Sequence, residues 1–558
     1  MQKTDRTSDA DSPREWSAAG RRLSEEAAIL LAVFAVGLVA VVLAFRPLGT
    51  PAIGFDSAAS VLYFDRIAAH QPLEAWVSTT PKPFVTLLYG IVFNLAHDWR
   101  ALSVLATLEY VAMLAAAAAL ALRTGGPVAA GMAASGLLGS YLLFEDGSLT
   151  YATPWAILFW VAAGLALTAR WPRFGLAGIA LFLGALARVE TFIILGLAAV
   201  ALGVWRFAPA ALLGEIPRPP RRAALLLLGF LALPVMILHD WLLTGNGFFW
   251  VDVSTIVSKA VPAAVMSPTQ LASTLVDHFA GNWARLAMLV LFAAGVLDLA
   301  RRRQTVVLIG LAACGPGVIA FLEFLAFRNT YVSGRYLIPA DAAVVFGAAL
   351  GAQALVTLAS AAARRAVPSL VARAPGSAAS TGLGIRLVAA GGWVVVGALV
   401  AVALIRPYGP ISQDTRGTVS GSIALQADVQ LALPTISAAM DALPDRPAWI
   451  LTDVERPNQG PPPRLWVPSL LVPNVAVDMG LPVWSVRGGS PIGGDPSILT
   501  VSVTTIVYVD RDHGGNVAQD DAPFEVDHVV RVGRTTVTPL LSLPDRGLWV
   551  VMLSPAGT

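Results

Sequence analysis

The chain has 558 residues, of which 56% are hydrophobic and only 13% are charged. Because soluble domains usually carry about a quarter charged residues, this composition excludes an ordinary soluble protein. The net charge of +2 is too small to indicate binding to nucleic acid. The single cysteine, Cys314, leaves no intrachain disulfide. The chain is therefore predicted to be an α-helical polytopic membrane protein.

Apolar stretches recur along the chain up to residue 406. Their lengths are close to the roughly 20 residues that a helix needs to cross a bilayer. The first follows a polar tail, 1–26, and no small-residue cleavage site follows it, so it is predicted to be an uncleaved span. A transmembrane domain over 27–406 follows, with a first outer loop at 47–99. About eleven spans are predicted, at 27–46, 100–122, 127–144, 152–169, 174–188, 191–206, 222–243, 285–300, 304–327, 335–359 and 386–406.

Clusters of arginine predict which connections are cytoplasmic. They lie at Arg21/Arg22, Arg170/Arg173, Arg206 with Arg218, Arg221 and Arg222, Arg301–Arg303, and Arg364, Arg365 and Arg373. If Pro81–Trp99 crossed the membrane, the later clusters would fall outside. This stretch begins with prolines and is barely long enough to cross. It is therefore predicted to be an interfacial or re-entrant helix, which places the tail 1–26 inside and the C-terminus outside.

The composition changes after Arg406, where about 150 residues follow without a span. Two segments rich in Val, Thr and Ile, Ser497–Asp510 and His528–Leu543, are predicted to form strands. The stretch 407–558 is thus expected to be an extracytoplasmic domain with a mixed α/β or mostly β fold. Three tryptophans there fit either a hydrophobic core or sugar stacking: Trp466, Trp484 and Trp549.

The first outer loop carries isolated charges and two predicted helices, Ser57–His70 and Pro83–Leu95. Asp56 stands at the start of the first helix, where it fits a catalytic acid, a solvated loop acid or a helix cap. Asp65, further along, is expected to form a surface pair with Arg66. Lys82 lies between two prolines. It fits either a phosphate-binding residue or a residue at the membrane interface whose ammonium group reaches the lipid headgroups.

Other ionisable residues gather at predicted outer ends. Arg188 and Glu190 lie between two short apolar stretches, at a depth where charges are costly and usually functional. The alternative for them is a structural ion pair within the bundle. Other acids and bases at outer ends are Glu145, Asp146, His239, Asp240, Arg328 and Arg335. For His239 and Asp240, acid–base or metal chemistry stands beside helix capping, and for Arg328 and Arg335, phosphate binding stands beside interface anchoring. No metal-ligand spacing and no Walker loop is present.

Several stretches together resemble the GT-C glycosyltransferases, polytopic enzymes that use polyprenyl-phosphate sugars. Asp56 after the first span, followed by an aromatic-containing helix and a proline-flanked "PFVTLL" helix, is similar to that family's first outer loop. "LARVETFIILG" (186–196) resembles its L-x-R-P-E segment, with Val189 in place of proline. "SGRYLIPA" (333–340) resembles its R-Y-x-x-P segment. "YATPW" (151–155) is similar to its ATPD segment, but Trp155 stands where many members carry an acid, and Glu145 or Asp146 is expected to compensate.

The resemblance implies transfer of a sugar from a lipid phosphate to an acceptor hydroxyl, with inversion at the anomeric carbon. Such a reaction needs a carboxylate that accepts the hydroxyl proton, and Asp56 is the first candidate. It also needs cations that stabilise the departing phosphate. Those candidates are Lys82, Arg188, Arg335 and Arg328, while Glu145, Asp146, Glu190, His239 and Asp240 are candidates for a second acid or for acceptor binding. No cofactor or metal is expected.

The expected partners are a lipid-linked sugar donor, a cell-envelope glycan, lipid or protein as acceptor, and membrane lipids. The Ala-, Arg- and Val-rich composition fits a high-GC bacterium, and the expected location is a bacterial plasma membrane. An arabinofuranosyl or mannosyl donor is left open. Two alternatives remain. A transporter or flippase needs ionisable residues along a midplane path, whereas a non-catalytic envelope scaffold needs no functional Asp56.

Overall fold

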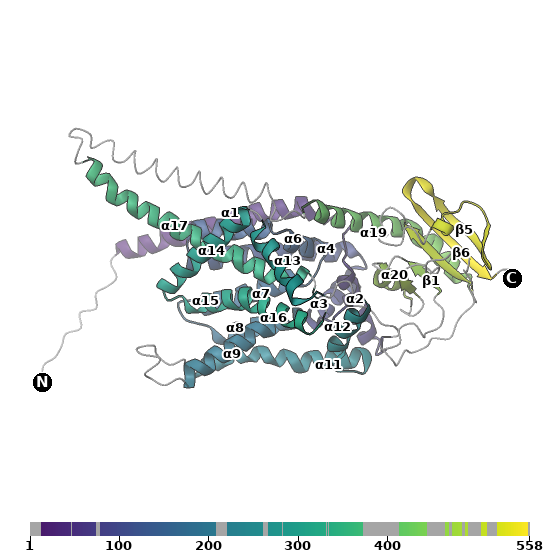
Figure 1. Ribbon diagram of the computed structural model, residues 1–558, viewed down its shortest axis with the longest axis horizontal. Coiled ribbons are helices and arrows are strands. Elements are labelled where there is room, and N and C mark those ends of the chain that lie inside the picture. The colour runs from purple at the N-terminus through teal and green to yellow at the C-terminus, as the bar shows by residue number, and fades with distance from the viewer. Residues whose placement is uncertain are drawn as a thin grey trace.

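A computed structural model describes most of the chain. The described residues are 13–45, 47–73, 79–207, 220–260, 266–281, 283–330, 332, 334–371, 412–443, 464–467, 471–481, 486–488, 504–510 and 522–555. The predicted span at 386–406, Trp484, and the first part of the predicted strand Ser497–Asp510 lie outside the described residues. The molecule is a bundle of apolar helices with a small sheet at one end (Figure 1).

The helices follow the apolar stretches of the sequence. Those of the first half are α1 (Pro13–Phe45), α2 (Phe55–Ala68), α3 (Pro83–Ala96), α4 (Trp99–Thr124), α5 (Pro127–Leu138), α6 (Tyr141–Ser148), α7 (Thr153–Leu167), α8 (Phe174–Ala187) and α9 (Thr191–Phe207). Those that follow are η1 (Arg221–Leu231), α11 (Ala232–Thr244), α12 (Phe249–Ala260), α13 (Pro268–Ala280), α14 (Trp283–Arg301), α15 (Thr305–Ala312), η3 (Ala313–Gly317), α16 (Val318–Phe327), η4 (Gly334–Leu337) and α17 (Ile338–Val371). The two helices predicted for the first outer loop are confirmed as α2 and α3.

The helices confirm a polytopic membrane protein by their length and composition. Within the described ranges, seven helices are long and apolar enough to cross a membrane, or eight if the bent pair α5 and α6 forms one span. Four shorter apolar helices accompany them, namely α3, α7, α8 and α9. The count of about eleven spans stays a prediction.

Helix α3 starts and ends at the same end of the bundle. Its 14 residues extend roughly 21 Å at about 1.5 Å per residue, which is shorter than the roughly 30 Å hydrocarbon core. At its start, Lys82 contacts Asp56. Just beyond its end, Arg100 donates from Nε to the carbonyl of Gly49, the loop that follows α1, at 3.2 Å. This geometry agrees with the predicted interfacial helix.

The arginine-rich connections lie at the opposite end of α4. Arg123, in the last turn of α4, donates to the carbonyl of Leu165 at the end of α7, at 2.7 Å. Arg302 donates to the carbonyl of Thr124 at 2.8 Å. The other end of α4, at Trp99, meets the C-terminal domain. The arginine-rich connection Arg301–Arg303 and the C-terminal domain therefore lie at opposite ends of α4, and which of the two ends is cytoplasmic stays a prediction.

The C-terminal domain has a mixed α/β fold, one of the two forms predicted. Its elements are α19 (Ser412–Asp441), β1 (Leu465–Val467), α20 (Val472–Asp478), β2 (Val486–Gly488), β3 (Thr505–Asp510), η8 (Ala522–Phe524), β4 (Val530–Val532), β5 (Thr535–Leu543), η9 (Pro544–Arg546) and β6 (Leu548–Pro555). The strand order is β2-β1-β3-β6-β5-β4, with β1 parallel to β2 and β3 and the other pairs antiparallel. Trp549 on β6 is 4% exposed and belongs to the core.

Part of α19, Gly421–Asp441, is one of the seven apolar helices, although the sequence predicts no span there. Its buried side chains, among them Val429 and Ile436, pack in one hydrophobic cluster with the sheet residues Ile506 and Val550. A protein core therefore accounts for the apolar side of this helix.

The same core includes helix α2 of the transmembrane domain. Leu62 and Tyr63 of α2 pack with residues of α19, α20 and the sheet. At the edge of this contact, Trp99 donates from Nε1 to Oδ1 of Asp478 at 2.7 Å, and Arg66 donates to the carbonyl of Leu481 at 3.2 Å. Arg66 thus reaches the C-terminal domain, whereas the sequence paired it with Asp65. Figure 1 shows this domain in yellow and green beside α2.

Site-directed labelling tests the predicted topology. In a Cys314→Ala background, a cysteine replacing His528, which is 77% exposed, is expected to react with an impermeant maleimide on intact cells. A cysteine replacing Trp171, which is 73% exposed in the arginine-rich connection, is expected to react only after permeabilisation. The reverse pattern would invert the predicted orientation.

Candidate functional site

Asp56 lies in the first turn of α2, beside the connection between α6 and α7. The backbone N–H of Gly54 donates to the carbonyl of Leu149 at 2.9 Å. A Cβ at Gly54 would lie 2.4 Å from the ring of Tyr151, so only glycine allows this close approach. The helix begins at Phe55 with Gly54 as its N-cap and without a side-chain cap. The alternative of Asp56 as the helix cap is therefore wrong.

The carboxylate of Asp56 joins three segments that are distant in the sequence. Its Oδ1 accepts a hydrogen bond from Oγ1 of Thr79 at 2.8 Å. Its Oδ2 lies 3.2 Å from Nζ of Lys82 and 3.4 Å from Nη1 of Arg335. Lys82 also donates to the carbonyl of Thr80 at 3.1 Å. The side chain of Asp56 is 19% exposed and that of Arg335 is 33% exposed, so the group is open to one side.

The two cations set the charge state of Asp56. Burial by itself raises the pKa of Asp56, but the positive charges of Lys82 and Arg335 and the hydrogen bond from Thr79 outweigh it and hold the pKa well below its usual range. Burial lowers the pKa of Lys82, and the charge of Asp56 opposes that effect only in part. Asp56 is therefore ionised at neutral pH. Its ion pairs stabilise the fold at neutral pH, and this stabilisation is lost only as the pH falls through the depressed pKa.

A second charged group lies at the junction of α8 and α9. Arg188 Nε lies 3.1 Å from both carboxylate oxygens of Glu190, and its Nη2 donates to Glu190 as well. Its Nη1 donates to Oγ1 of Thr153 at 2.5 Å and lies 3.9 Å from Oδ2 of Asp146. The guanidinium stands 5.8 Å from the ring centre of Tyr336. Arg188 and Glu190 are 8% and 4% exposed, so they form the buried ion pair that the sequence left open as an alternative.

Four uncharged residues that the sequence did not single out contact these charges. They are Thr79, Tyr151, Thr153 and Tyr336. The ring of Tyr151 lies 4.3 Å from the guanidinium of Arg335, within the range of a cation–π interaction. Three of the four lie within the "YATPW" and "SGRYLIPA" stretches, so these two motifs already indicated that part of the sequence as a site. Thr79 stands only near Lys82 in the sequence, and no pattern marks it.

Asp146, an acid expected to compensate for Trp155, lies beside the Arg188 group. Trp155 packs edge-to-face against Phe84, with ring centres 5.3 Å apart. Asp146, on α6, is fully buried and accepts a hydrogen bond from the threonine of "YATPW". Glu145, the neighbouring acid, is half-buried, and the positive charge of Arg335 acts on it. The structure therefore brings both of the expected compensating acids to this end of the bundle.

Three predicted site residues lie apart from this group. Arg328 is exposed at the end of α16. His239 Nδ1 lies 3.1 Å from Oδ1 of Asp240, whose Oδ2 accepts the backbone N–H of Trp250 at 2.8 Å. In the described ranges no hydrogen bond or ion pair joins these three residues to Asp56. Over the same residues, no three His, Cys, Asp or Glu side chains are grouped as metal ligands would be.

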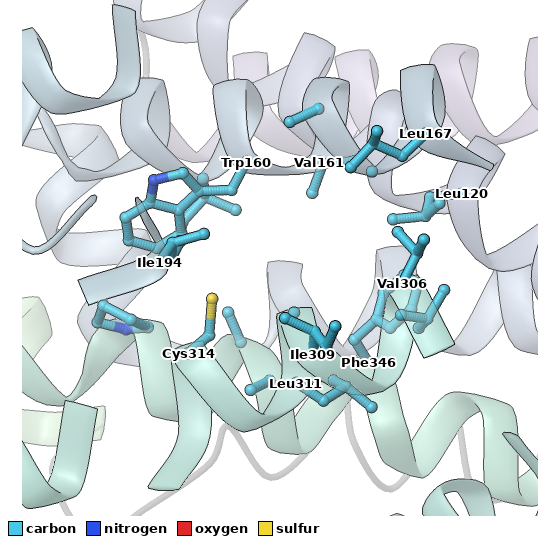
Figure 2. A pocket seen from close by; sticks show the side chains of 18 of the residues that line it. Leu120, Trp160, Val161, Leu167, Ile194, Val306, Ile309, Leu311, Cys314 and Phe346 are labelled. Atoms are coloured by element: carbon cyan, nitrogen blue, oxygen red, sulfur yellow. The ribbon is translucent and has the colours of Figure 1, made fainter. Parts of the chain in front are cut away.

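An apolar cavity of about 170 Å³ lies between the membrane helices. Figure 2 shows Trp160 and Val161 of α7 on one side of it and Cys314 on the other. Two of its lining residues, Ile157 and Pro339, follow Thr153 and Arg335 by four residues, or about one helical turn. The cavity lining therefore includes residues about one turn along the chain from two residues of the charged site.

The fold and the site together define a polytopic membrane protein with a charged cluster around Asp56 on α2, the helix on which the C-terminal mixed α/β domain packs. No protein-family model and no curated protein sequence matches the chain.

Among solved structures, the chain is similar to ArnT from Cupriavidus metallidurans in the apo state, with 12% identity, 96% of this chain and 98% of that chain covered, and a TM-score of 0.47. The same protein bound to undecaprenyl phosphate gives 12% identity, 97% and 98% coverage and a TM-score of 0.42. The apo oligosaccharyltransferase of Archaeoglobus fulgidus gives 14% identity, 87% and 70% coverage and a TM-score of 0.46. Because these TM-scores are below 0.5, the function of this chain is argued from its own residues and not from these similarities.

Proposed function

We propose that this chain is a membrane glycosyltransferase of GT-C type, which moves a sugar from a polyprenyl-phosphate donor to a cell-envelope acceptor at the outer face of a bacterial plasma membrane. The observation that carries the proposal is the carboxylate of Asp56 between Lys82 and Arg335. Pro339, four residues after Arg335, lines an apolar cavity. One end of this site suits a phosphate and the other suits a lipid tail.

The donor's phosphate would bind to Lys82 and Arg335. Both cations are partly exposed, and Arg335 offers the planar fork that pairs with phosphate oxygens. Arg188 lies deeper, and Glu190 already balances its charge. Arg188 would therefore contribute positive electrostatic potential near the phosphate, whereas Lys82 and Arg335 would make the direct contacts. The isoprenoid tail would enter the cavity, where it meets only apolar side chains.

Asp56 would be the base. In the ligand-free site its pKa is depressed because Lys82 and Arg335 pair with it. A donor phosphate competes for the same two cations, so donor binding weakens those ion pairs and makes Asp56 more basic. The acceptor hydroxyl, arriving from the aqueous side, would give its proton to Asp56 as its oxygen attacks the anomeric carbon. The polyprenyl phosphate would leave toward the cations, and the configuration of the sugar would invert.

Charge removal is expected to weaken donor binding. Each charge-assisted hydrogen bond to phosphate contributes about 1.5–3 kcal/mol, so Lys82→Ala and Arg335→Ala should each raise the Kd for undecaprenyl phosphate about 10- to 100-fold. Binding to purified protein in nanodiscs measures this effect. Arg301→Ala, with a 73% exposed side chain on α14, is the matched control. A larger loss in Arg328→Ala than in Arg335→Ala would instead move the phosphate site to the end of α16.

Transfer itself is tested with radiolabelled polyprenyl-phosphate hexoses and pentoses, and with an envelope extract as the source of acceptors. The wild type is expected to label the extract and to release polyprenyl phosphate. Movement of intact donor across proteoliposomes without release would favour the flippase. Neither cleavage nor movement would favour the scaffold.

A further inference from the structure

The hydroxyl of Thr79 orients the carboxylate of Asp56, and Tyr63 of α2 in turn holds the backbone of Thr79. Thr79 donates from Oγ1 to Oδ1 of Asp56 at 2.8 Å. The carbonyl of the same Thr79 accepts a hydrogen bond from the phenol of Tyr63 at 3.0 Å. Tyr63 thus fixes the backbone of Thr79, and the side chain of Thr79 fixes the carboxylate of Asp56. Asp56 and Tyr63 are seven residues, or about two turns, apart on α2, so α2 and the segment before α3 are joined at two points.

Tyr63 is placed by the C-terminal domain as well as by the transmembrane domain. Its side chain is 1% exposed and shares a hydrophobic cluster with Phe249 of α12, Val429 of α19 and Val475 of α20. A buried phenol needs a hydrogen-bond partner, and the carbonyl of Thr79 supplies one. The position of Thr79 is therefore coupled to the packing of the C-terminal domain on α2.

We propose that Thr79 and Tyr63 are positioning residues for the base, and that together they transmit the packing of the C-terminal domain to the carboxylate of Asp56. The inference rests on the proposed role of Asp56 as the base. Without the Thr79 hydroxyl, the carboxylate keeps its two cations but loses the bond that fixes its Oδ1. The carboxylate is then no longer held in one orientation.

The hydroxyl of Thr79 also acts on the proton affinity of Asp56. A hydrogen bond to a carboxylate favours its charged form, so removing the donor raises the pKa of Asp56. Several other groups that face Asp56 remain unchanged in such a variant. They are Lys82, Arg335, Tyr63, Tyr151 and Asp146. The change in pKa therefore reports the single bond that is removed.

The test compares Thr79→Val, Tyr63→Phe and Thr79→Ser in the full-length protein in nanodiscs. Thr86→Val is the matched control, because Thr86 is 2% exposed and its hydroxyl has no hydrogen-bond partner among the described residues. Carbodiimide modifies protonated carboxyl groups, so labelling of the Asp56 peptide at a fixed, mildly acidic pH is measured by mass spectrometry. Thr79→Val is expected to raise this labelling about tenfold. Tyr63→Phe should raise it less, and Thr79→Ser should restore the wild-type level.

The transfer assay adds a second readout. Thr79→Val is expected to lower kcat and leave the KM for the donor unchanged, because Lys82 and Arg335 are intact. Equal labelling in Thr79→Val and Thr86→Val would overturn the inference, whether or not the protein transfers sugar. If labelling rises while the wild type cleaves no donor, the positioning stands and the proposed function fails. The two hypotheses are therefore distinguished by separate measurements.

Discussion

Replacing Asp56 by asparagine is expected to abolish transfer while the protein folds and binds its donor. The amide is similar in shape and still accepts a hydrogen bond from Thr79, but it cannot take up the acceptor's proton. General-base catalysis typically contributes roughly 10²- to 10⁴-fold, so single-turnover transfer should fall by about that factor. Donor affinity should hold or rise, because the amide no longer competes with phosphate for Lys82 and Arg335.

Asp65→Asn is the matched control for this variant. Asp65 lies on the same helix and accepts a hydrogen bond from Asn94 at 2.8 Å, outside the contacts of Asp56. It is expected to keep a transfer rate close to that of the wild type. A wild-type rate in Asp56→Asn would instead show that the base lies elsewhere, with Glu145, Asp146 and Asp240 as the remaining acids.

Arg188→Ala is expected to cost stability more than donor affinity. It leaves Glu190 buried, 4% exposed, without the guanidinium that contacts both of its oxygens. Breaking a buried pair from one side typically costs about 3–5 kcal/mol. The free energy of unfolding, measured by denaturation in mixed micelles, should fall by about that amount.

The double variant Arg188→Ala/Glu190→Ala separates a structural pair from a phosphate ligand. If the pair is structural, the double variant recovers most of the lost stability, because no buried charge of this pair remains. If Arg188 instead binds the donor directly, Arg188→Ala loses undecaprenyl phosphate binding with little loss of stability. The double variant would then bind no better than the single one.

The sequence alone determined the membrane character of this protein and the elements around the base. Hydrophobic stretches and proline positions are local properties, so they predicted α2 and α3 closely and kept Pro81–Trp99 from being counted as a span. Asp56 could be selected because an acid after the first span, at the start of a helix, matches the first outer loop of the family that the sequence resembles, and because transfer to a hydroxyl needs a base. The predicted strand segment His528–Leu543 likewise contains β4 and β5, joined at Gly533, whose positive φ suits a tight hairpin turn.

Only the tertiary structure decided which charges meet. Arg335 reaches Asp56 across 279 residues of sequence, and Arg328, seven residues earlier, is exposed. The contacts of Arg188 with Glu190 and Asp146 likewise appear only in the fold. Such contacts depend on how separate helices pack, and no local period or spacing encodes that. The core that the C-terminal domain shares with α2 was equally hidden from sequence analysis. The apolar pattern of a strand shows that the strand is buried but not against which partner.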